Sequence, residues 1–385
     1  MNSAKSNDLK VALLVGTLNS GGAEKMMVQL ANALNTVGVA VDLILVNKTG
    51  PFLDDVLPGV HIRNLNAVKG VKSVITDIRK FLKDNIVDAI ISTQPHVNSV
   101  LGYASIGLNK KPLIIMREAS TPSRKYSDIN PVSTFLYKTG YRFADHYVAV
   151  SEGVKKDMRA AYNLPESSIT TIHNPVIDDS VTERCKEPTG DSWFDDPEKP
   201  VILAVGRIVP LKNHKMLIEA FAKVREHKDA RLVILGDKQS DPDHTEVLND
   251  LIMDLNLSNH VKLPGFVSNP FSYLSRASLF VLSSDYEGLP GTLIQALGCG
   301  CPVVSTECPN GPAEILEAGK WGILTPPRDA EKMAESILRA MNSNHDSERL
   351  KSRATDFSSD KSASKYITLI RKLMDEKIRV SDTNE

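Results

Sequence analysis

Cysteine is scarce in this sequence, with four residues among 385, and this excludes a fold held together by disulfides. Cys299, Cys301 and Cys308 lie close together but lack the paired Cys-x2-Cys spacing of a zinc site. We interpret them as small buried residues where a helix meets a strand. No apolar run approaches the roughly 18–20 residues of a membrane span, and the polar residues 1–8 lack the apolar core of a signal peptide. These absences predict a cytoplasmic protein.

A strong net charge is also missing, since the whole chain carries a formal charge of −1. The charges are nevertheless unevenly distributed: residues 1–176 contain 20 Lys and Arg against 14 Asp and Glu, and the remainder contains 26 against 33. A basic half joined to an acidic half indicates that one face meets an anionic surface or substrate. Neither half is strongly basic and no nucleic-acid motif is present, so we expect no nucleic-acid partner.

Alternating strand and helix patterns predict an α/β protein with doubly wound parallel sheets, and the length predicts two domains. We expect a first domain at 1–177, an inter-domain linker at 178–199, a second domain at 200–360, and a final helix with tail at 361–385. The strands expected from short apolar runs are Leu9–Val15, Val41–Val46, Val87–Ser92, Pro112–Met116, His146–Val150, Ile169–Ile172, Val201–Val205, Arg231–Leu235 and Leu279–Leu282.

A Gly/Pro-rich turn connects the strand Leu279–Leu282 to a helix expected from Thr292 onward. Ligands bind where such turns open at the carboxyl edge of a parallel sheet, and the free N–H groups of a new helix favour a phosphate. Glu287, at the head of the turn, suits sugar hydroxyls, which can donate to a carboxylate. Arg207 and Lys212 follow another strand and can bracket one polyanion. Together these features predict a nucleotide-sugar site.

Loops after strands in the first half supply further candidates. Asn19–Gly22 joins a strand to a helix, and its glycines permit close approach of a ligand, although Gly-x-Gly-x-x-Gly is absent. His96, Arg117 and Glu118 follow other strands, but a lone loop histidine is more often merely solvated. A plain strand-to-helix turn also remains an explanation for the glycines.

Residues 69–83 combine apolar positions at helical spacing with five Lys and Arg residues. One interpretation is an amphipathic helix on an anionic leaflet, which would make the protein peripheral at the inner face of the plasma membrane. The other is an ordinary helix that faces the core and carries solvated lysines. The local pattern favours the second interpretation.

Glu287, seven residues and Gln295, followed by Ala-Leu-Gly-Cys-Gly-Cys-Pro-Val-Val, resemble the signature of the retaining GT-B glycosyltransferases of family 4. That signature normally has Glu at both ends of the first spacing. Gln295 can keep the ribose contact expected of the second Glu, but without its charge-assisted contribution. Gly206, Arg207 and Lys212 resemble the family's Gly-Arg-x4-Lys, whose cations neutralise the donor diphosphate.

The resemblance implies a GT-B fold, in which two Rossmann-like domains face a central cleft and the final helix packs back on the first domain. It implies retaining transfer of a hexose or N-acetylhexosamine from a UDP-sugar, without a metal or other cofactor, to a glycan or polyprenyl-diphosphate-linked acceptor. The implied catalytic residues are Glu287, Arg207 and Lys212. The implied donor-binding residues are Gly206, Gly265, Phe266, Val267, Gly288, Leu289, Pro290, Gly291, Thr292, Leu293 and Gln295. The acceptor-side candidates are Gly21, Gly22, His96, Arg117 and Glu118, where the family often has a histidine in place of the last two.

Two alternatives to transfer stay open. Gln295 could mark a module that binds a nucleotide sugar without transferring it, and sugar-nucleotide epimerases share the same fold. Asp241-Pro242-Asp243 matches the Asp-x-Asp metal pattern of the other glycosyltransferase fold. Its place before a helix favours helix capping instead.

Overall fold

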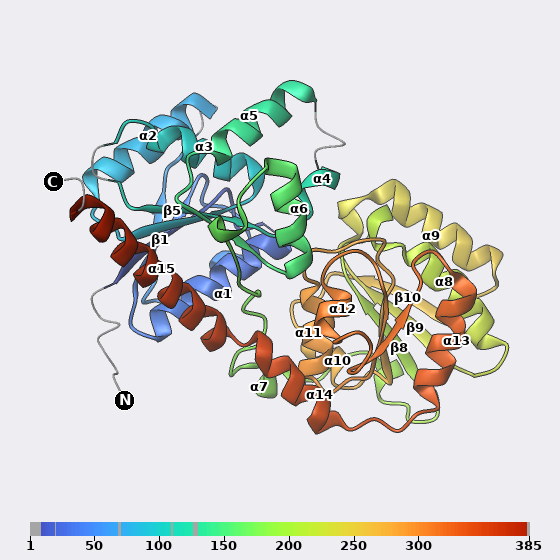
Figure 1. The fold of residues 1–385 in the computed structure, drawn as a ribbon. Coiled ribbons are helices and arrows are strands. Elements are labelled where there is room, and N and C mark those ends of the chain that lie inside the picture. Colours follow the sequence, from blue (N-terminus) through green and yellow to red (C-terminus); the bar gives the residue numbers. More distant parts are fainter. Residues whose placement is uncertain (1–8, 20, 68–70, 109–110, 126–129, 383–385) are drawn as a thin grey trace. The chain divides into compact units, whose positions relative to one another are not determined.

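The computed structural model describes residues 9–19, 21–67, 71–108, 111–125 and 130–382. The chain forms two units, residues 1–176 with 357–385 and residues 177–356, each built on a parallel sheet (Figure 1). The expected doubly wound α/β architecture is therefore confirmed for each unit. Among the described residues, no helix combines the length and the apolar character that a bilayer crossing requires.

The first unit has a seven-stranded sheet in the order β3-β2-β1-β4-β5-β6-β7, and every neighbouring pair is parallel. Its inner strands are buried on both faces, as the continuous apolar runs predicted. The bounds are β1 (Lys10–Val15), β2 (Ala40–Leu45), β3 (His61–Asn64), β4 (Ala89–Thr93), β5 (Leu113–Glu118), β6 (His146–Ala149) and β7 (Ile169–Thr171).

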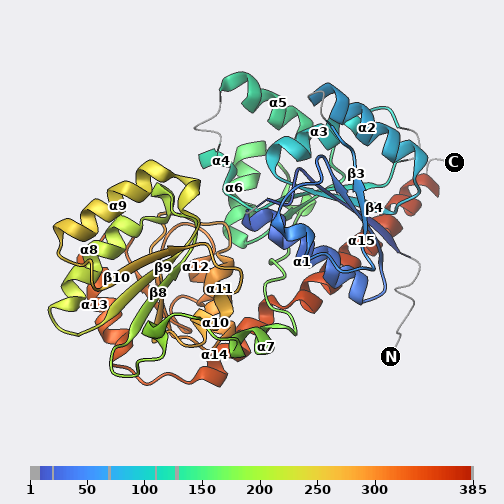
Figure 2. The ribbon, with the colours of Figure 1, turned by 180° about the vertical axis from the view of Figure 1, so that it is seen from behind.

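Helices cover both faces of this sheet. In Figures 1 and 2, α1 and α15 lie on one face, and α2, α3 and α5 lie on the other. The helices are α1 (Gly22–Thr36), α2 (Val71–Asp84), α3 (Pro95–Ser105), α4 (Pro122–Lys125), α5 (Pro131–Tyr141), α6 (Glu152–Tyr162) and α15 (Ser359–Asp382), with 3-10 turns η2 (Pro51–Leu53), η4 (Glu166–Ser168) and η8 (Thr355–Phe357).

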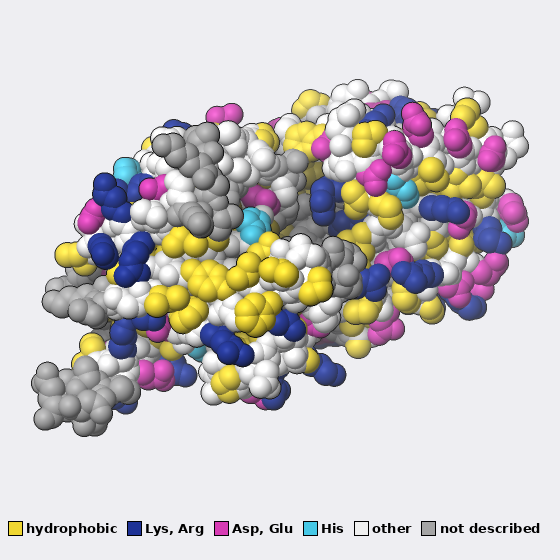
Figure 3. Space-filling model, turned by 90° about the horizontal axis from the view of Figure 1, so that it is seen from above, with side chains coloured by type: hydrophobic (Ala, Val, Ile, Leu, Met, Phe, Trp, Pro, Cys, Tyr) yellow, Lys and Arg dark blue, Asp and Glu magenta, His cyan; other side chains and the backbone are white. Residues whose placement is uncertain are grey.

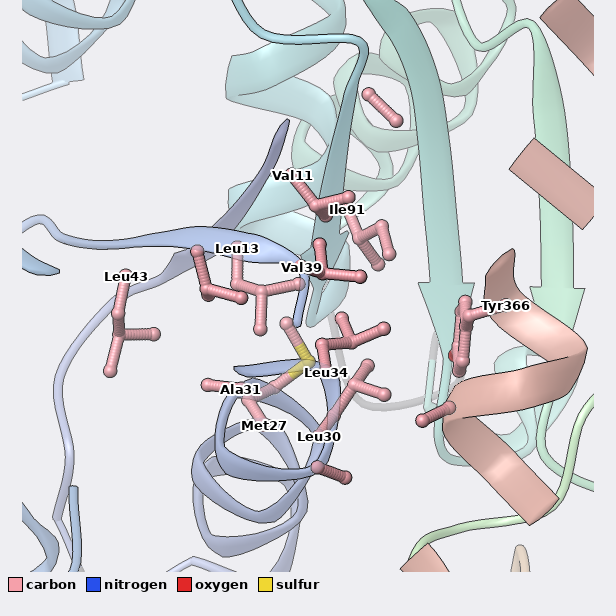
Figure 4. Close-up of a cluster of buried hydrophobic side chains, with 14 of the residues drawn as sticks. Val11, Leu13, Met27, Leu30, Ala31, Leu34, Val39, Leu43, Ile91 and Tyr366 are labelled. Carbon is pink, nitrogen blue, oxygen red and sulfur yellow. The ribbon is translucent and has the colours of Figure 1, made fainter. Parts of the chain in front are cut away.

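The final helix is an integral part of the first unit's core. Alternate residues of β1, including Val11 and Leu13, point toward Met27 and Leu30 of α1, and Tyr366 of α15 joins the same cluster (Figure 4). All five side chains are buried. Burial of a large apolar side chain stabilises by about 1.5–3 kcal/mol, so α15 is held by its apolar face rather than by a tether alone.

Helix α2 faces the protein with its apolar side. Ile78, Phe81 and Leu82 are buried, and the helix packs beside α3. Val74 and Ile75 of the same stripe are partly exposed. The burial of Ile78 and Leu82 favours the interpretation of this segment as an ordinary helix that faces the core. Lys69 and the side chains of Val71 and Lys72, which belong to the same prediction, lie outside the described part of the chain.

The second unit has a six-stranded sheet in the order β10-β9-β8-β11-β12-β13, again parallel throughout. Its strands are β8 (Val201–Val205), β9 (Arg231–Leu235), β10 (Val261–Gly265), β11 (Leu279–Leu282), β12 (Val303–Thr306) and β13 (Ile323–Thr325). Its helices are α7 (Val181–Lys186), α8 (His214–Arg225), α9 (Pro242–Asp254), α10 (Pro270–Leu274), α11 (Gly291–Gly298), α12 (Pro312–Ile315), α13 (Ala330–Met341) and α14 (Ser347–Ala354), with η5 (Ser192–Phe194), η6 (Pro210–Lys212) and η7 (Lys238–Ser240).

The stretch 178–199, expected as a linker, contains α7 and η5 and belongs to the second unit. Helix α7 packs on α10, where the guanidinium of Arg184 lies 4.4 Å from the ring centroid of Phe271. The polar composition of this stretch hid its structure because its contacts are made by cations over rings rather than by an apolar stripe.

In both sheets the chain order reverses beside the first strand of the unit. Strand β1 lies between β2 and β4, and β8 lies between β9 and β11. Ligands of open parallel sheets bind at such switch points, beyond the carboxyl ends of the strands. The loops after β1 and β4, and those after β8 and β11, are therefore where a site is expected.

Candidate functional site

The loops after β8 and β11 bring Lys212 and Glu287 into direct contact. The Nζ of Lys212 donates to Oε1 of Glu287 at 2.5 Å, and the Oγ of Ser284 donates to the same oxygen at 2.6 Å. The side chains of Lys212 and Glu287 are only 17% and 12% exposed. The Oε2 of Glu287 makes no hydrogen bond within the described residues, so one carboxylate oxygen is held and the other is open.

Arg207 directly follows Gly206 at the end of β8, and its side chain is exposed. The sequence prediction placed its charge beside that of Lys212, and no ion pair of Arg207 is found in the described part of the chain. Since Lys212 and Glu287 neutralise each other, Arg207 supplies the uncompensated positive charge of this edge. Gly236, after β9, lies so close that a Cβ there would stand 1.9 Å from the carbonyl oxygen of Gly206.

A set of hydrogen bonds that the sequence did not reveal fixes the two loops to each other. Asp285 accepts from Nδ2 of Asn213 at 2.9 Å and from Nη2 of Arg328 at 2.7 Å. Its own N–H donates to the carbonyl of Leu211, and the Oγ of Ser283 donates to the carbonyl of Lys212. The position directly after a buried strand was the available signal, because side chains there reach across the sheet edge. These residues position Lys212 and Glu287.

Helix α11 begins at Gly291 without a side-chain cap, and Pro290 stands at its N-cap. Its first N–H groups, with the helix dipole, therefore remain suited to an anion. Gly288, Pro290, Gly291 and Thr292 form this turn, whereas Leu289 and Leu293 are buried as packing residues. Gly311 packs closely against this turn. Its φ of 82° disfavours other residues, and a Cβ placed there would lie 2.6 Å from Cδ of Pro290. A side chain at position 311 therefore has no room.

Gln295, one turn further along α11, is buried. Its side-chain amide makes no hydrogen bond within the described residues, and it is not among the polar groups that are cut off from solvent. Gly265, at the end of β10, adopts a φ of 103°, and Phe266 after it is exposed while Val267 is half-buried. The amide of Gln295 and the exposed ring of Phe266 are groups that a nucleoside can engage.

His214 lies beneath the same loops as the first residue of α8, and the sequence reasoning missed it. Burial lowers its pKa to about 3, assisted by the positive charge of Lys212, so the ring is neutral. Its Nδ1 is buried and has no hydrogen-bond partner among the described residues. A neutral ring at this position adds no charge to the edge.

The first unit's switch point holds a polar cluster. The Nε2 of Gln94, after β4, donates to Oε1 of Glu24 on α1 at 2.7 Å. A Cβ placed at Gly16, after β1, would lie 3.6 Å from Oε1 of Gln94 and 3.8 Å from Nε2 of His96. The predicted His96 is exposed in this cluster, and the predicted Gly21 leaves the space that the Glu24 carboxylate occupies, 2.0 Å from where a Cβ would stand.

Gly22 is open, with nothing within 4 Å of a Cβ placed there. Glu24 and Gln94 were missed. The Gly-Gly-Ala-Glu run could have identified Glu24 from the sequence. The unusual feature of Gln94 is its positive φ of 75°, which the sequence does not show.

Arg117 and Glu118 of β5, predicted as acceptor-side residues, are both buried. Arg117 donates to Oγ1 of Thr93 at 2.9 Å and to Oδ1 of Asn174, and burial lowers its pKa. The carboxyl of Glu118 accepts from the hydroxyl of Tyr141 at 2.7 Å. Successive residues of a strand point to opposite faces of the sheet, so each becomes part of a different interior network.

Asp241 is the N-cap of α9, and its carboxylate accepts from the N–H of His244 at 3.0 Å. The capping interpretation of the Asp-x-Asp match is thereby confirmed. Within the described ranges, no group of three or more His, Cys, Asp and Glu residues is arranged to hold a metal ion.

Two family models and several known proteins are similar to this chain. The family model of glycosyl transferases group 1 matches residues 189–357, and that of glycosyltransferase family 4 matches residues 20–180. An uncharacterized glycosyltransferase of Methanocaldococcus jannaschii is 31% identical over 69% of this chain and 68% of its own length. The N-acetylgalactosamine-N,N'-diacetylbacillosaminyl-diphospho-undecaprenol 4-alpha-N-acetylgalactosaminyltransferase of Campylobacter jejuni is 28% identical over 85% of this chain and 89% of its own length.

Solved structures share the fold. A glycosyltransferase from Rickettsia africae superposes with a TM-score of 0.80 at 20% identity, covering 96% of this chain and 99% of that one. The Anabaena protein HepE in complex with UDP and glucose superposes with a TM-score of 0.73 at 19% identity, covering 97% and 100%. Two parallel-sheet units of this kind constitute the GT-B fold. The chain therefore belongs to the group 1 glycosyltransferases of the GT-B fold.

Proposed function

We propose that this chain transfers a hexose or N-acetylhexosamine, with retention and without a metal, from a UDP-sugar to a lipid-linked glycan. The observation that carries the proposal is the edge beyond β8 and β11. That edge carries a held carboxylate, a paired ammonium, a guanidinium without an ion pair among the described residues, and the uncapped N-terminus of α11. These groups match the alternating demands of a nucleotide sugar, which is anionic at its diphosphate and rich in hydroxyls at its sugar.

In this proposal the diphosphate binds to Arg207 and the first N–H groups of α11. Arg207 offers a bidentate fork to phosphate oxygens. Lys212 leaves its contact with Glu287, in whole or in part, and adds a point charge to the same group. As the bond to the sugar breaks, negative charge grows on the departing diphosphate, and preorganised cations stabilise that charge without a metal.

Glu287 orients the sugar. Ser284 holds its Oε1, and Oε2 is free within the described residues to accept from sugar hydroxyls. This division is the reason for proposing that Ser284 keeps the carboxylate in place when Lys212 turns to the phosphate. We assign no enzymatic nucleophile, so retention here is a proposed single-face reaction in which the leaving diphosphate and the attacking hydroxyl share one side of the sugar.

The nucleoside end is assigned to Gln295 and to residues 265–267. The amide of Gln295 can both accept from and donate to ribose hydroxyls, and it does so without the charge of the Glu that the family usually has. UDP is proposed because HepE, which shares the fold, binds UDP and glucose.

The acceptor is proposed to bind at the edge that carries Glu24, Gln94 and His96. Two Campylobacter jejuni relatives are named for diphospho-undecaprenol-linked glycans, and one of them aligns with 94% of this chain at 24% identity. A lipid-linked glycan is therefore the acceptor class that the relatives favour. The two alternatives, a binding module without transfer and an epimerase, gain no support from these relatives, which are named as transferases.

A screen of thermal unfolding against UDP-, GDP- and ADP-sugars tests the donor, since a bound donor raises the melting temperature by mass action. Arg207→Ala and Glu287→Ala should each abolish sugar transfer while leaving the far-UV circular dichroism unchanged. Arg339→Ala and Glu335→Ala, on α13 of the same unit, are the matched controls and should retain transfer. Near-normal turnover of both site variants would refute the proposed function.

A further inference from the structure

Helix α5 carries an apolar surface that the first unit does not cover. Val132, Phe135 and Leu136 are 69%, 66% and 47% exposed. Their spacing of three and four residues places them together on one side of the helix. Ile106, directly after α3, is also exposed. It lies near this surface, because the hydroxyl of Tyr103 of α3 donates to the carbonyl of Leu136 at 2.8 Å. Figure 3 looks down on this side of the unit and shows a patch of apolar side chains there.

The helix is firmly seated on its other side. A Cβ at Gly102 of α3 would lie 2.1 Å from the carbonyl oxygen of Gly140, and a Cβ at Gly140 would lie 2.6 Å from Cα of Ser99. Only glycines allow the two helices to approach this closely. The hydroxyl of Tyr141 reaches the buried carboxyl of Glu118 from the same end of α5. The exposed side is therefore a fixed feature of a packed helix and not the face that the helix uses for folding.

The charged residues of α5 and of its C-terminal cap have one sign. Lys138 lies on α5 and Arg142 is its C-cap, and neither has an ion pair within the described residues. The sequence contains no acidic residue between Asp88 and Glu118, the stretch that includes α3, or between Asp128 and Asp145, the stretch that includes α5. In Figure 3, Lys and Arg side chains border the apolar patch.

We propose that Val132, Phe135 and Leu136 insert into the interfacial region of an anionic lipid bilayer while Lys138 and Arg142 bind its headgroups. An aromatic and two branched apolar side chains next to cations match the composition of a membrane surface, which is apolar below and anionic above. A second copy of this chain fits less well. A symmetric dimer would place the same patch on both partners, and the cations beside it would face each other.

The inference rests on the proposed function only in taking a lipid-linked acceptor as the reason for a membrane partner. It also moves the membrane contact from α2, whose apolar side is largely buried, to α5. The two surfaces lie in the same unit, but among the described residues of these two helices the exposed large apolar side chains belong to α5.

Sedimentation of the full chain with vesicles tests the inference. The vesicles consist of phosphatidylcholine alone, or of phosphatidylcholine and phosphatidylglycerol in equal parts. We expect binding to the mixed vesicles that weakens with salt and is weaker on phosphatidylcholine alone. The variant Val132→Ser, Phe135→Ser, Leu136→Ser should reduce the partition coefficient roughly tenfold or more. Lys138→Glu with Arg142→Glu should cause a loss of about tenfold, restricted to the mixed vesicles.

Val247→Ser with Met253→Ser is the matched control, because these α9 residues are 51% and 58% exposed on the second unit. The control should bind vesicles as the unaltered chain does. Equal binding by the α5 variants, or no vesicle binding by the unaltered chain, would overturn the inference. So would a loss of dimer in sedimentation velocity with vesicle binding unchanged, because this result would assign the patch to a second copy.

The test is separate from that of the proposed function. Hydrolysis of the donor in the absence of vesicles should be the same in the α5 variants and the unaltered chain. Conversely, Glu287→Ala should bind vesicles normally. Failure of docking therefore leaves the sugar chemistry intact, and failure of the sugar chemistry leaves docking to be measured.

Discussion

The two sheet edges of this protein handle charge in opposite ways. At the edge of the second unit, Lys212 and Glu287 pair at the surface of a loop network, and Arg207 stays exposed. At the edge of the first unit, Arg117 and Glu118 are drawn into the interior, and the accessible cluster consists of Glu24, Gln94 and His96. In this protein the charges beyond the ends of β8 and β11 stay at least partly exposed. The charges on β5 itself are enclosed by interior hydrogen bonds.

Glu287→Gln should have the largest effect. The amide oxygen can still accept from Ser284, but the negative charge that balances Lys212, and that we propose orients the sugar, is lost. We expect turnover to fall about 10²–10³-fold, with little change in the melting temperature. Steady-state transfer and differential scanning calorimetry measure the two quantities. If Glu118→Gln lowered turnover per folded molecule as strongly, the contrast between the edges would be lost.

Acid should destabilise the second unit through His214. Its folded-state pKa of about 3 lies below the value of about 6.5 for an unfolded histidine, so the unfolded chain takes up the proton first. Stability therefore falls as pH decreases from about 6.5 toward 3, by about 2–3 kcal/mol near pH 4.5. His214→Gln should remove this share of the loss in urea titrations at several pH values. An unchanged pH profile would show that the ring titrates normally.

The first unit has a counterpart in His146, whose pKa burial lowers to about 4. The sign is the same, so the first unit also weakens as pH falls below about 6.5. Its loss should level off below about pH 4, sooner than that of the second unit. Separate reporter fluorophores in the two units distinguish the two profiles.

Tyr141→Phe should destabilise the first unit by about 1.5–3 kcal/mol, because it removes a donor from the buried carboxyl of Glu118. Donor affinity should not change. Tyr273→Phe, which removes a bond from Tyr273 to the neutral carbonyl of Thr189, is the control and should cost only about 0.5–1.5 kcal/mol. An altered dissociation constant for the donor in Tyr141→Phe would contradict a purely structural role.

Gly21→Ala should have a smaller effect, about 1 kcal/mol, because the new methyl group displaces the flexible carboxylate of Glu24 from Gln94. Glu24→Ala added to Gly21→Ala should recover the loss that the clash causes. The unfolding free energies of the two single variants and the double variant give the coupling. Additive losses would mean that Glu24 does not occupy this position.

Thiol labelling should give the subtlest signal. All four cysteines lie in the second unit, and the Sγ of Cys185 lies 3.4 Å from that of Cys299. This hydrogen bond lowers the pKa of Cys185 to about 7, whereas burial raises those of Cys301 and Cys308 to about 12. Alkylation by iodoacetamide should therefore occur first at Cys185 and accelerate as pH rises through about 7. Cys299→Ser should weaken this preference, and labelling of Cys308 before Cys185 would contradict it.

Much of the fold could be predicted because it depends on local patterns. Strands β8, β9 and β11 begin and end where their apolar runs do, since buried parallel strands are apolar throughout. Strand β3 escaped prediction because it is a short edge strand with polar residues. Helix α7 was not predicted because it lies in a polar stretch, and its packing partners on α10 are distant in the sequence.

The site residues likewise divide into those that local patterns predicted and those whose contacts are distant in the sequence. Glu287, Lys212 and Arg207 could be named because motif and strand position coincide, and the structure brings the first two within 2.5 Å. Ser284 and Asp285 are single polar residues in the turn, and apart from their position after a buried strand nothing local distinguishes their side chains from solvated ones. The role of Asp285 depends on Asn213 and Arg328, which approach only after the sheet has formed.

The sequence by itself determined two parallel-sheet units and the loops that carry the proposed nucleotide-sugar site, because apolar periodicity and turn residues act over a few neighbouring positions. Only the tertiary structure decided that the apolar side of α2 is largely covered while that of α5 is exposed. It alone also decided that Arg117 and Glu118 are interior. The physical reason is that burial is a property of what packs against a residue, and those partners lie tens to hundreds of positions away along the chain.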